Sequence, residues 1–331
     1  MTVLITGGSG FIGTALARRL AAAGRDFRIG DTVESQAFPD RHDPLDITSD
    51  EVIGAPGARG AGAIIHLAAV HRDDVRPVSL YDKVNVEGTR NVAALAEEAG
   101  IERIVFTSTV AVYGFGAPET DESGEIRPFN DYGRTKAEAE DVLRDWQGRD
   151  PEVRSLTIVR PTVVFGPGNR GNVFNLLNQM ARGRFVMVGN GRNQKSMAYV
   201  ENVAAFLDKA LGFGPGIHLF NYVDKPDYDM DSLVRHVNTV INGRDRVGPR
   251  LPVPVALSLG HGADLIATLT GRSLPVSAIR VKKFVKETSF ASAAHVVPDF
   301  AAPVPLGEGL RRTLEAEFLN PDPDRVLHYT E

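Results

Sequence analysis

The chain has 331 residues, a formal net charge of -5 and no cysteine. Its length allows two domains, and its content of hydrophobic residues (43%) and charged residues (24%) is ordinary for a soluble globular protein. The net charge argues against a general nucleic-acid-binding surface, and the absence of cysteine excludes disulfides and thiolate catalysis.

Short apolar runs alternate with helical patterns in the first half of the chain, as in a parallel sheet flanked by helices. We predict strands at 2–6, 27–30, 63–67, 103–108 and 155–160. Helices are predicted at 11–23, about 78–99 and about 132–147, each followed by a glycine that suits a helix C-cap. After a loop at 166–169 we expect a helix at about 172–182, strands near 185–188 and 197–200, a helix at 201–211 and a strand at 217–222.

The last third of the chain, residues 224–331, is richer in proline, and its elements are expected to be shorter. The whole pattern predicts an α/β fold, with a Rossmann-type doubly wound parallel sheet and a smaller mixed α/β substrate lobe. We expect the sheet domain to comprise residues 1–165 and about 194–223. The lobe would then comprise residues of about 166–193 and 224–331.

A glycine-rich turn joins the first predicted strand to the first predicted helix. Gly7, Gly10 and Gly13 have the G-x-x-G-x-x-G spacing. Glycine lets the backbone approach a pyrophosphate closely, and the N-terminus of the following helix offers free N–H groups to the phosphates. Such a turn alone is a weak signal, but its place between strand and helix favours a dinucleotide site over an ordinary turn.

Asp31 ends the second predicted strand. A carboxylate there accepts hydrogen bonds from both ribose hydroxyls of NAD and repels the 2′-phosphate of NADP. No arginine follows it immediately, so the sequence favours NAD; a solvated aspartate at a strand end is the alternative interpretation. Further cofactor contacts are predicted at the glycine turn and at the ends of the other strands: Phe11, Ile12, Asp46, Ile47, Leu67, Ala68, Ala69, Thr107, Pro161 and Thr162.

Tyr132 and Lys136 lie four residues apart at the start of a predicted helix, so the phenol and the ammonium share one helix face. A nearby ammonium stabilises the phenolate and lowers the pKa of a phenol from its usual value of about 10, which makes a general base. Thr109 ends a predicted strand 23 residues earlier, and its hydroxyl can share the substrate's proton. A surface pair on a helix is the alternative interpretation of this spacing.

In order and spacing, these motifs resemble the pattern of the extended short-chain dehydrogenase/reductase family, and within it the sugar-nucleotide epimerase and dehydratase group. The resemblance also rests on residues 66–69, 112–114, 160–161 and 166–168. It implies that Thr109, Tyr132 and Lys136 form the catalytic triad and that Asn85 lies near the cofactor. It also implies a homodimer through the helices at 78–99 and 132–147.

Two departures from the family pattern narrow the expected chemistry. Val110 and Ala111 stand where the sugar 4,6-dehydratases carry an Asp-Glu pair, so elimination of water is disfavoured. Val163 replaces an asparagine, and Lys195 an arginine, that contact the diphosphate in many nucleotide-sugar epimerases. Lysine still pairs with phosphate as a point charge but lacks the bidentate fork of arginine, which puts a UDP-type pocket in question.

Several stretches are similar to a narrower bacterial branch, whose members epimerise an N-acetylhexosamine carried on undecaprenyl diphosphate. These stretches are 71–75, 171–177, 195–200, 221–227 and 280–284. The resemblance implies a lipid-linked substrate, with a soluble UDP-sugar as the alternative. Substrate contacts are predicted at His71, Arg72, Thr109, Asn172, Lys195 and Arg280.

Residues 251–269 are apolar but interrupted by two prolines, a histidine and an aspartate, and Arg280, Lys282, Lys283 and Lys286 follow them. An apolar segment beside a cationic patch suits docking on an anionic membrane, whereas a core helix with a solvated basic face fits equally well. No apolar run reaches the roughly 20 residues that span a bilayer, and a strand begins almost at the first residue. We expect a cytoplasmic protein, or one peripheral to the inner membrane.

Together these features predict an isomerase, an NAD-dependent 4-epimerase of a diphosphate-linked sugar that works through a transient 4-keto intermediate in surface polysaccharide synthesis. A keto-sugar reductase or dehydrogenase of the same fold is one alternative, and it would consume NAD(P) stoichiometrically. A non-catalytic NAD sensor is another, but it would be free to lose Thr109, Tyr132 and Lys136. No metal is expected, because the histidines and acidic residues show no metal-ligand spacing.

Overall fold

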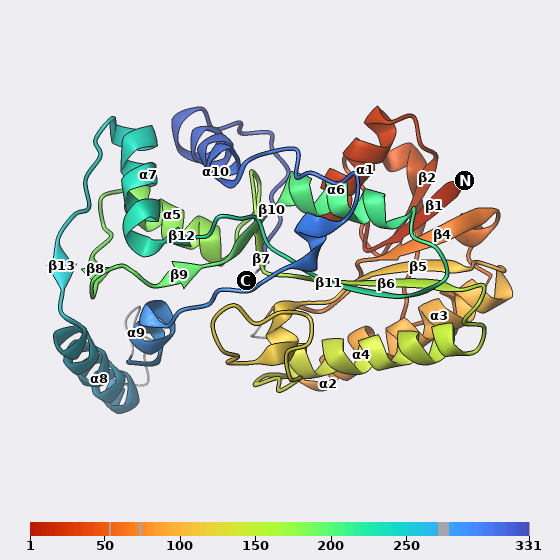
Figure 1. Cartoon of the computed structure of the whole chain (residues 1–331), viewed down its shortest axis with the longest axis horizontal. Coiled ribbons are helices and arrows are strands. Elements are labelled where there is room, and N and C mark those ends of the chain that lie inside the picture. Colours follow the sequence, from red (N-terminus) through yellow and green to blue (C-terminus); the bar gives the residue numbers. More distant parts are fainter. Residues whose placement is uncertain (53, 73–74, 271–277, 331) are drawn as a thin grey trace.

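The computed structural model describes residues 1–52, 54–72, 75–270 and 278–330, with the backbone alone for residues 50, 265–270, 280 and 283. A seven-stranded parallel sheet lies at the centre of its larger part (Figure 1). The strand order is β11 (Gly216–Tyr222), β6 (Ser155–Pro161), β5 (Arg103–Thr107), β4 (Ala61–His66), β1 (Thr2–Thr6), β2 (Phe27–Asp31) and β3 (His42–Pro44). The order runs outward from β1 in both directions, so the predicted doubly wound fold is confirmed.

Helices cover both faces of the sheet. α1 (Phe11–Ala22) and α6 (Val200–Ala210) pack on one face, and α3 (Gly88–Glu98) and α4 (Asp131–Gly148) pack on the other (Figure 1). Residues of β1 alternate between the two cores, since Ile5 packs with α1 and α6 whereas Leu4 packs with α3 and α4. Coverage on both faces explains why the strands are almost continuous apolar runs in the sequence.

The predicted helix at 78–99 is not a single α-helix. α2 (Ser79–Tyr81) leads into a π-helical segment, Asp82–Glu87, before α3 begins. The Thr89 hydroxyl donates to the Asn85 carbonyl at 2.5 Å and lies 3.1 Å from Nε2 of the buried His66. A π-helical turn is a local bulge that functional sites often use, and the 3.6-residue periodicity of the sequence does not reveal it. The other predicted strands and helices lie within two residues of their observed bounds.

A smaller lobe has its own hydrophobic core, which includes Leu177, Met230 and Leu310. Its helices are α5 (Asn172–Ala181), α7 (Met230–Asn242), α8 (Val253–Thr270), α9 (Ala278–Val285) and α10 (Leu306–Leu314), the last followed by a π-helical segment, Glu315–Leu319. Three pairs of short strands lie outside the seven-stranded sheet: β7 (Val163–Phe165) with β10 (Met197–Tyr199), β8 (Met187–Val188) with β13 (Arg250–Leu251), and β9 (Gln194–Lys195) with β12 (Tyr228–Asp229).

The prediction of short elements after residue 224 is wrong for two helices, because α7 has 13 residues and α8 has 18. Met230, Leu233 and Val237 are buried at helical spacing along α7. The prediction of short elements rested on the proline content of the region and did not take this apolar spacing into account. Pro252 and Pro254 stand at the start of α8, where a missing N–H costs no helical hydrogen bond. Among the described helices, none is long and apolar enough to cross a membrane.

The chain crosses between the two parts more than once. All seven strands of the sheet lie within residues 1–165 and 194–223, and we propose this division of the domains. Ala294, Val297 and Phe300 come from the C-terminal portion of the chain, but they pack in the core between the sheet and the helices α1 and α6. The two parts are therefore interleaved in sequence, and the space between them is lined from both.

Candidate active site

A cavity of about 790 Å³ opens where β1, β4 and β5 end. The strand order reverses between β1 and β4, and doubly wound sheets bind ligands in the crevice at this point. Gly7 after β1, Ala68 after β4 and Thr109 after β5 all line the cavity. The topology of the sheet therefore brings these residues, which are far apart in the sequence, to one cavity.

The glycine turn shapes one wall of the cavity. Gly7 has a φ of +71°, and a Cβ there would lie 2.5 Å from the backbone nitrogen of Ala68. A Cβ on Gly13 would lie 2.5 Å from the Cα of Gly8, so α1 packs directly against the turn. Gly10 is the N-cap of α1 and faces open space, where a Cβ would meet only the Gly7 carbonyl at 3.3 Å. The first N–H groups of α1 are thus available to a phosphate.

Asp31 lies at the end of β2 beside the glycine turn, with its carboxylate held in place by two backbone groups. The Ser9 N–H donates to one carboxylate oxygen at 3.0 Å, and the Val33 N–H donates to the other at 3.1 Å. Each oxygen keeps a further lone pair for a ribose hydroxyl. Asp46 also lines the cavity, and its side chain is held by the N–H and hydroxyl of Thr48 at 2.8 Å each. The residues present therefore fit a dinucleotide.

The structure brings the three predicted catalytic residues to the same cavity. Tyr132 and Lys136 enter it from the first turns of α4, whose start is capped by Asn130, because Asn130 Oδ1 accepts the Gly133 N–H at 2.9 Å. Thr109 enters from the end of β5. Its Oγ1 accepts the Ala111 N–H at 3.1 Å, which orients the hydroxyl and leaves its proton to donate toward the cavity.

Lys136 is buried, and its Nζ lies 4.0 Å from the centre of the Phe106 ring. Burial lowers the pKa of Lys136 to about 7 from 10.5, and the Glu140 carboxylate opposes this shift. Near neutral pH the ammonium and amine forms are therefore both present. Because the unfolded chain binds more protons than the folded chain between these two values, the contribution of Lys136 to the free energy of unfolding rises with pH across that window.

Asn85, which the resemblance placed near the cofactor, lies behind the cavity wall. Its Oδ1 accepts the Val70 N–H at 2.8 Å, and its Nδ2 donates to the Val70 carbonyl and to Thr135 Oγ1 at 2.9 Å each. Only 1% of Asn85 is exposed. Asn85 therefore holds the loop after β4 against α4, and it positions Ala68 and Ala69 in the wall.

The predicted substrate contacts divide into three groups. His71, Thr109 and Asn172 line the cavity, whereas Arg72 and Lys195 do not. Arg280 lies in α9, but its side chain is outside the part of the chain that the structure describes. Lys195 Nζ donates to the carbonyl of Lys286 at 2.5 Å, and burial lowers the pKa of Lys195 to about 8.

Five further residues line the cavity from segments beyond the strand ends, and no sequence motif indicated them: Asn169, Ser196, Thr288, Phe290 and Thr330. Ser196 Oγ accepts the Phe290 N–H at 3.0 Å and donates to Asp227 at 2.9 Å, which joins two distant segments. Thr330 Oγ1 donates to Asn169 Oδ1 at 3.1 Å, so the C-terminal segment crosses the loop before α5. No local pattern marks these residues, because tertiary folding alone brings them together.

A chain of buried polar groups lies behind the triad and links α4, β6 and β11. Arg160 Nε donates to Glu140 at 2.8 Å, and Arg160 Nη1 donates to the Tyr113 hydroxyl at 2.7 Å. The Tyr113 hydroxyl donates to Asn221 at 2.8 Å, and Ser108 Oγ donates to Glu140 at 2.5 Å. Glu140 was not predicted as part of the site, although it follows Lys136 by one helical turn and Arg160 is a charged residue in a fully buried strand.

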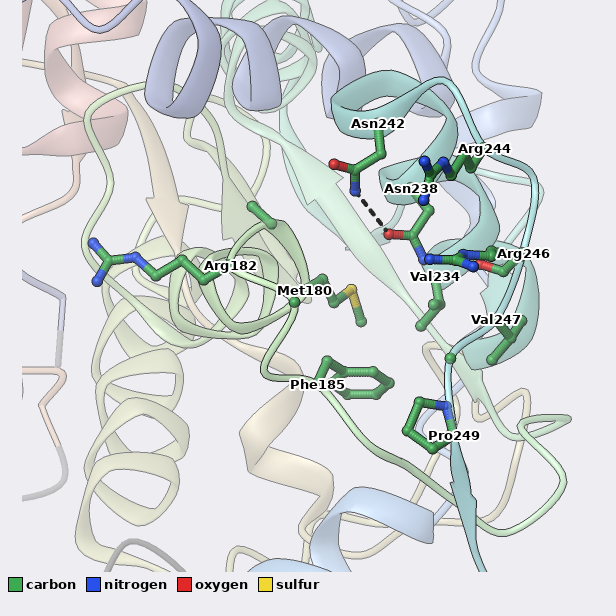
Figure 2. A pocket seen from close by; sticks show the side chains of 13 residues that line it. Met180, Arg182, Phe185, Val234, Asn238, Asn242, Arg244, Arg246, Val247 and Pro249 are labelled. Carbon is green, nitrogen blue, oxygen red and sulfur yellow. Dashed lines mark hydrogen bonds between the residues drawn. The ribbon is translucent and has the colours of Figure 1, made fainter.

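A second cavity, of about 670 Å³, lies in the lobe between α5, α7 and the segment before β13 (Figure 2). Met180, Phe185 and Val234 form its apolar floor, and Arg244 and Arg246 stand at its edge. None of its lining residues exchanges a proton near neutral pH, so it offers no acid–base catalysis. Within the described residues, no group of histidine, cysteine and acidic side chains is arranged to hold a metal ion.

Comparison with known proteins agrees with this geometry. The sequence profile of the NAD dependent epimerase/dehydratase family matches residues 3–221. The chain is 44% identical over 332 residues to the N-acetyl-alpha-D-glucosaminyl-diphospho-ditrans,octacis-undecaprenol 4-epimerase of Escherichia coli O157:H7, with 99% of each chain covered. It is 27% identical to the UDP-glucose 4-epimerase of Vibrio cholerae, with 82% of this chain and 85% of that protein covered.

Solved structures show the same fold at lower sequence identity. MoeE5 in complex with UDP-glucose and NAD superimposes with a TM-score of 0.71 at 24% identity, covering 95% of this chain and 98% of that one. The UDP-glucose 4-epimerase of Thermotoga maritima with UDP-glucose superimposes with a TM-score of 0.71 at 20% identity and the same coverage. The likeness extends over the sheet and the lobe together.

Proposed function

The chain belongs to the NAD dependent epimerase/dehydratase family, and from this premise we propose that it is an NAD-dependent 4-epimerase of a diphosphate-linked sugar. Its substrate is N-acetylglucosamine or N-acetylgalactosamine linked to undecaprenyl diphosphate, in surface polysaccharide synthesis. The observation that carries the proposal is that Tyr132, Lys136 and Thr109 meet in the cavity beside Gly10 and Asp31. Full-length identity of 44% to an enzyme named for a lipid-linked sugar supports the choice of carrier.

Each triad residue has a distinct task in this reaction. Tyr132, as the phenolate, takes the proton of the sugar C4 hydroxyl, and the Thr109 hydroxyl bridges between them. Lys136 in its ammonium form stabilises the phenolate. Bound NAD supplies the acceptor and donor of the hydride. The sugar passes through a 4-keto form, and Tyr132 returns the proton when the C4 hydroxyl re-forms with the opposite configuration, so there is no net oxidation.

Two cavity residues argue against elimination of water. Val110 and Ala111 follow Thr109 and line the cavity, but neither side chain can donate or accept a proton. A dehydratase needs a further acid and base beside the reacting sugar carbon. The lining of the cavity therefore favours proton transfer at the C4 hydroxyl over elimination of water from the sugar.

The proposal is tested by assaying the purified protein with undecaprenyl-diphospho-N-acetylglucosamine and, separately, with UDP-N-acetylglucosamine. No nicotinamide cofactor is added. We expect the lipid-linked sugar to give the N-acetylgalactosamine product, with the C4 configuration determined by NMR, and NAD to be found in the purified protein by mass spectrometry. A product that forms only when NADH or NADPH is consumed would identify a keto-sugar reductase instead.

We also propose that α8 makes peripheral contact with the cytoplasmic face of the membrane. Of its residues 253–264, Ala256 and Gly260 are buried, whereas Val255 and Leu259, one turn apart, are 46% and 59% exposed. α8 stands at one end of the molecule and packs on α9, so this half of the helix is not in the lobe's core (Figure 1). Exposed apolar side chains on α8, together with the exposed Lys282 on the adjacent α9, suit an anionic bilayer.

Vesicle flotation tests the membrane contact. We expect the protein to float with vesicles that contain phosphatidylglycerol, and the V255S/L259S variant to partition roughly tenfold more weakly, because two apolar anchors are lost. Val296→Ser is the matched control, since Val296 is 80% exposed but lies outside α8. Equal flotation of the α8 variant and the control would contradict the proposal.

A homodimer through α3 and α4 is a further proposal. The two helices pack against each other and lie side by side on one face of the sheet (Figure 1). Light scattering tests it, and we expect a molar mass of twice that of the chain. A monomer at micromolar concentration would contradict it.

A further inference from the structure

Two large aromatic side chains stand exposed beside the active-site cavity. Phe115 is 56% exposed and Phe129 is 48% exposed. Their rings stack with centres 4.5 Å apart and planes inclined by 19°. Gly114 and Asn130, which are the chain neighbours of the two phenylalanines, line the cavity itself. The pair therefore lies at the edge of the cavity, and an exposed apolar patch in such a place marks a contact site.

A lysine completes this edge. Lys286 Nζ lies 4.3 Å from the centre of the Phe115 ring and 3.5 Å from the Phe115 carbonyl oxygen. Lys195 Nζ reaches the carbonyl of Lys286, and Thr288, two residues further on, lines the cavity. The Lys286 ammonium thus stands against the aromatic pair, where a cation favours a diphosphate that enters the cavity.

The same edge is continuous with the helices at the end of the lobe. Lys286 directly follows α9, and α9 packs on α8. The segment after α9 runs beside the loop that contains Phe115, since the Glu119 N–H donates to the Ser289 carbonyl at 3.0 Å and the Ala291 N–H donates to the Thr120 carbonyl at 3.1 Å. The segment that carries Lys286 therefore connects the cavity edge to α9, and through α9 to α8.

We propose that Phe115 and Phe129, with Lys286 beside them, form the site that holds the isoprenoid chain of the carrier next to its diphosphate. This inference rests on the proposed function and deepens it. A cavity of about 790 Å³ that holds the cofactor and the sugar diphosphate leaves a long lipid chain no room, so the chain passes out over the edge. Covering two half-exposed rings with an apolar chain removes apolar surface from water.

The surroundings of the pair favour an isoprenoid over a nucleobase. Of the residues that directly flank the two phenylalanines in the sequence, Gly114, Gly116 and Pro128 carry no hydrogen-bonding side chain, whereas Asn130 Oδ1 accepts the Gly133 N–H as the cap of α4. A site selective for uracil needs polar partners for the edges of the base. A stacked aromatic surface whose sequence neighbours are mostly glycine and proline suits an apolar chain better than the edges of a base.

Calorimetric titration of the NAD-loaded protein with geranylgeranyl diphosphate and with UDP tests this site, because the two ligands share a diphosphate and differ in the group beyond it. We expect F115S/F129S to lower the ratio of geranylgeranyl diphosphate affinity to UDP affinity by roughly 10- to 100-fold. F115L/F129L retains apolar surface and should keep most of that ratio. The single serine variants are measured as well, so that misfolding of the double variant does not end the test.

Three outcomes would overturn the inference: no binding of geranylgeranyl diphosphate to the unaltered protein, an unchanged ratio in the serine variants, or a loss of affinity as large for UDP as for the isoprenoid. The last would indicate that a base stacks on the pair or that the pair is structural. If the unaltered protein binds geranylgeranyl diphosphate through the pair but epimerises no N-acetylglucosamine conjugate, the proposed function fails while this site stands.

Discussion

Tyr132→Phe lowers turnover by roughly 10²- to 10⁴-fold, which is the usual contribution of a positioned general base. The phenyl ring keeps the shape of the side chain at the start of α4, so the cavity wall and the Asn130 cap remain. Only the proton acceptor for the C4 hydroxyl is lost. Rates measured at saturating substrate, with NAD content determined by mass spectrometry on the same preparation, separate this loss from a loss of cofactor.

The matched control is Tyr228→Phe, because Tyr228 lies in β12 and its hydroxyl faces His236 at 3.5 Å, away from the cavity. We expect this variant to keep turnover within a few-fold of the unaltered protein. Full activity of Tyr132→Phe would refute the assignment of the base. Loss of activity together with loss of bound NAD would show instead that the phenol holds the cofactor.

The parts of the site that could be predicted from the sequence are those that local chemistry dictates. Gly7 needs a positive φ and close contact with Ala68, so its residue type is constrained by geometry within a few residues of the chain. Tyr132 and Lys136 share a helix face because of their spacing alone. The strands of the sheet are buried on both sides and are therefore visible as apolar runs.

The parts that could not be predicted depend on tertiary contacts. Ser196 and Phe290 are 94 residues apart, and a single hydrogen bond joins them at the cavity. The resemblance predicts that Asn85 lies near the cofactor, but it does not reveal that the Asn85 amide bonds to Val70 and to Thr135, which are 15 and 50 residues away. The π-helical turn that orients Asn85 has no signature in residue periodicity. In each case the role of the residue depends on the group that folding places beside it, and the sequence around the residue does not identify that group.

Arg160→Met should be among the most destabilising single changes in the sheet domain, with a loss of about 3–5 kcal/mol in the free energy of unfolding. The side chains of Arg160 and Glu140 are each only 3% exposed. Without the guanidinium, the Glu140 carboxylate stays buried with the Ser108 hydroxyl and with Arg144, whose nitrogen lies 3.6 Å away. The Tyr113 hydroxyl loses its donor as well.

Denaturant unfolding measures this loss, and two further variants show its cause. E140L/R160M should be less destabilised than R160M, because the buried Glu140 carboxylate is removed together with its guanidinium partner. Arg312→Met should change the free energy of unfolding by about 0–1 kcal/mol, since Arg312 pairs with Glu308 at the surface and is 44% exposed. If the double variant is as unstable as R160M, lost packing and not the buried carboxylate explains the effect. Packing, and not ion pairing, would then stabilise the end of β5, which places Thr109 in the cavity.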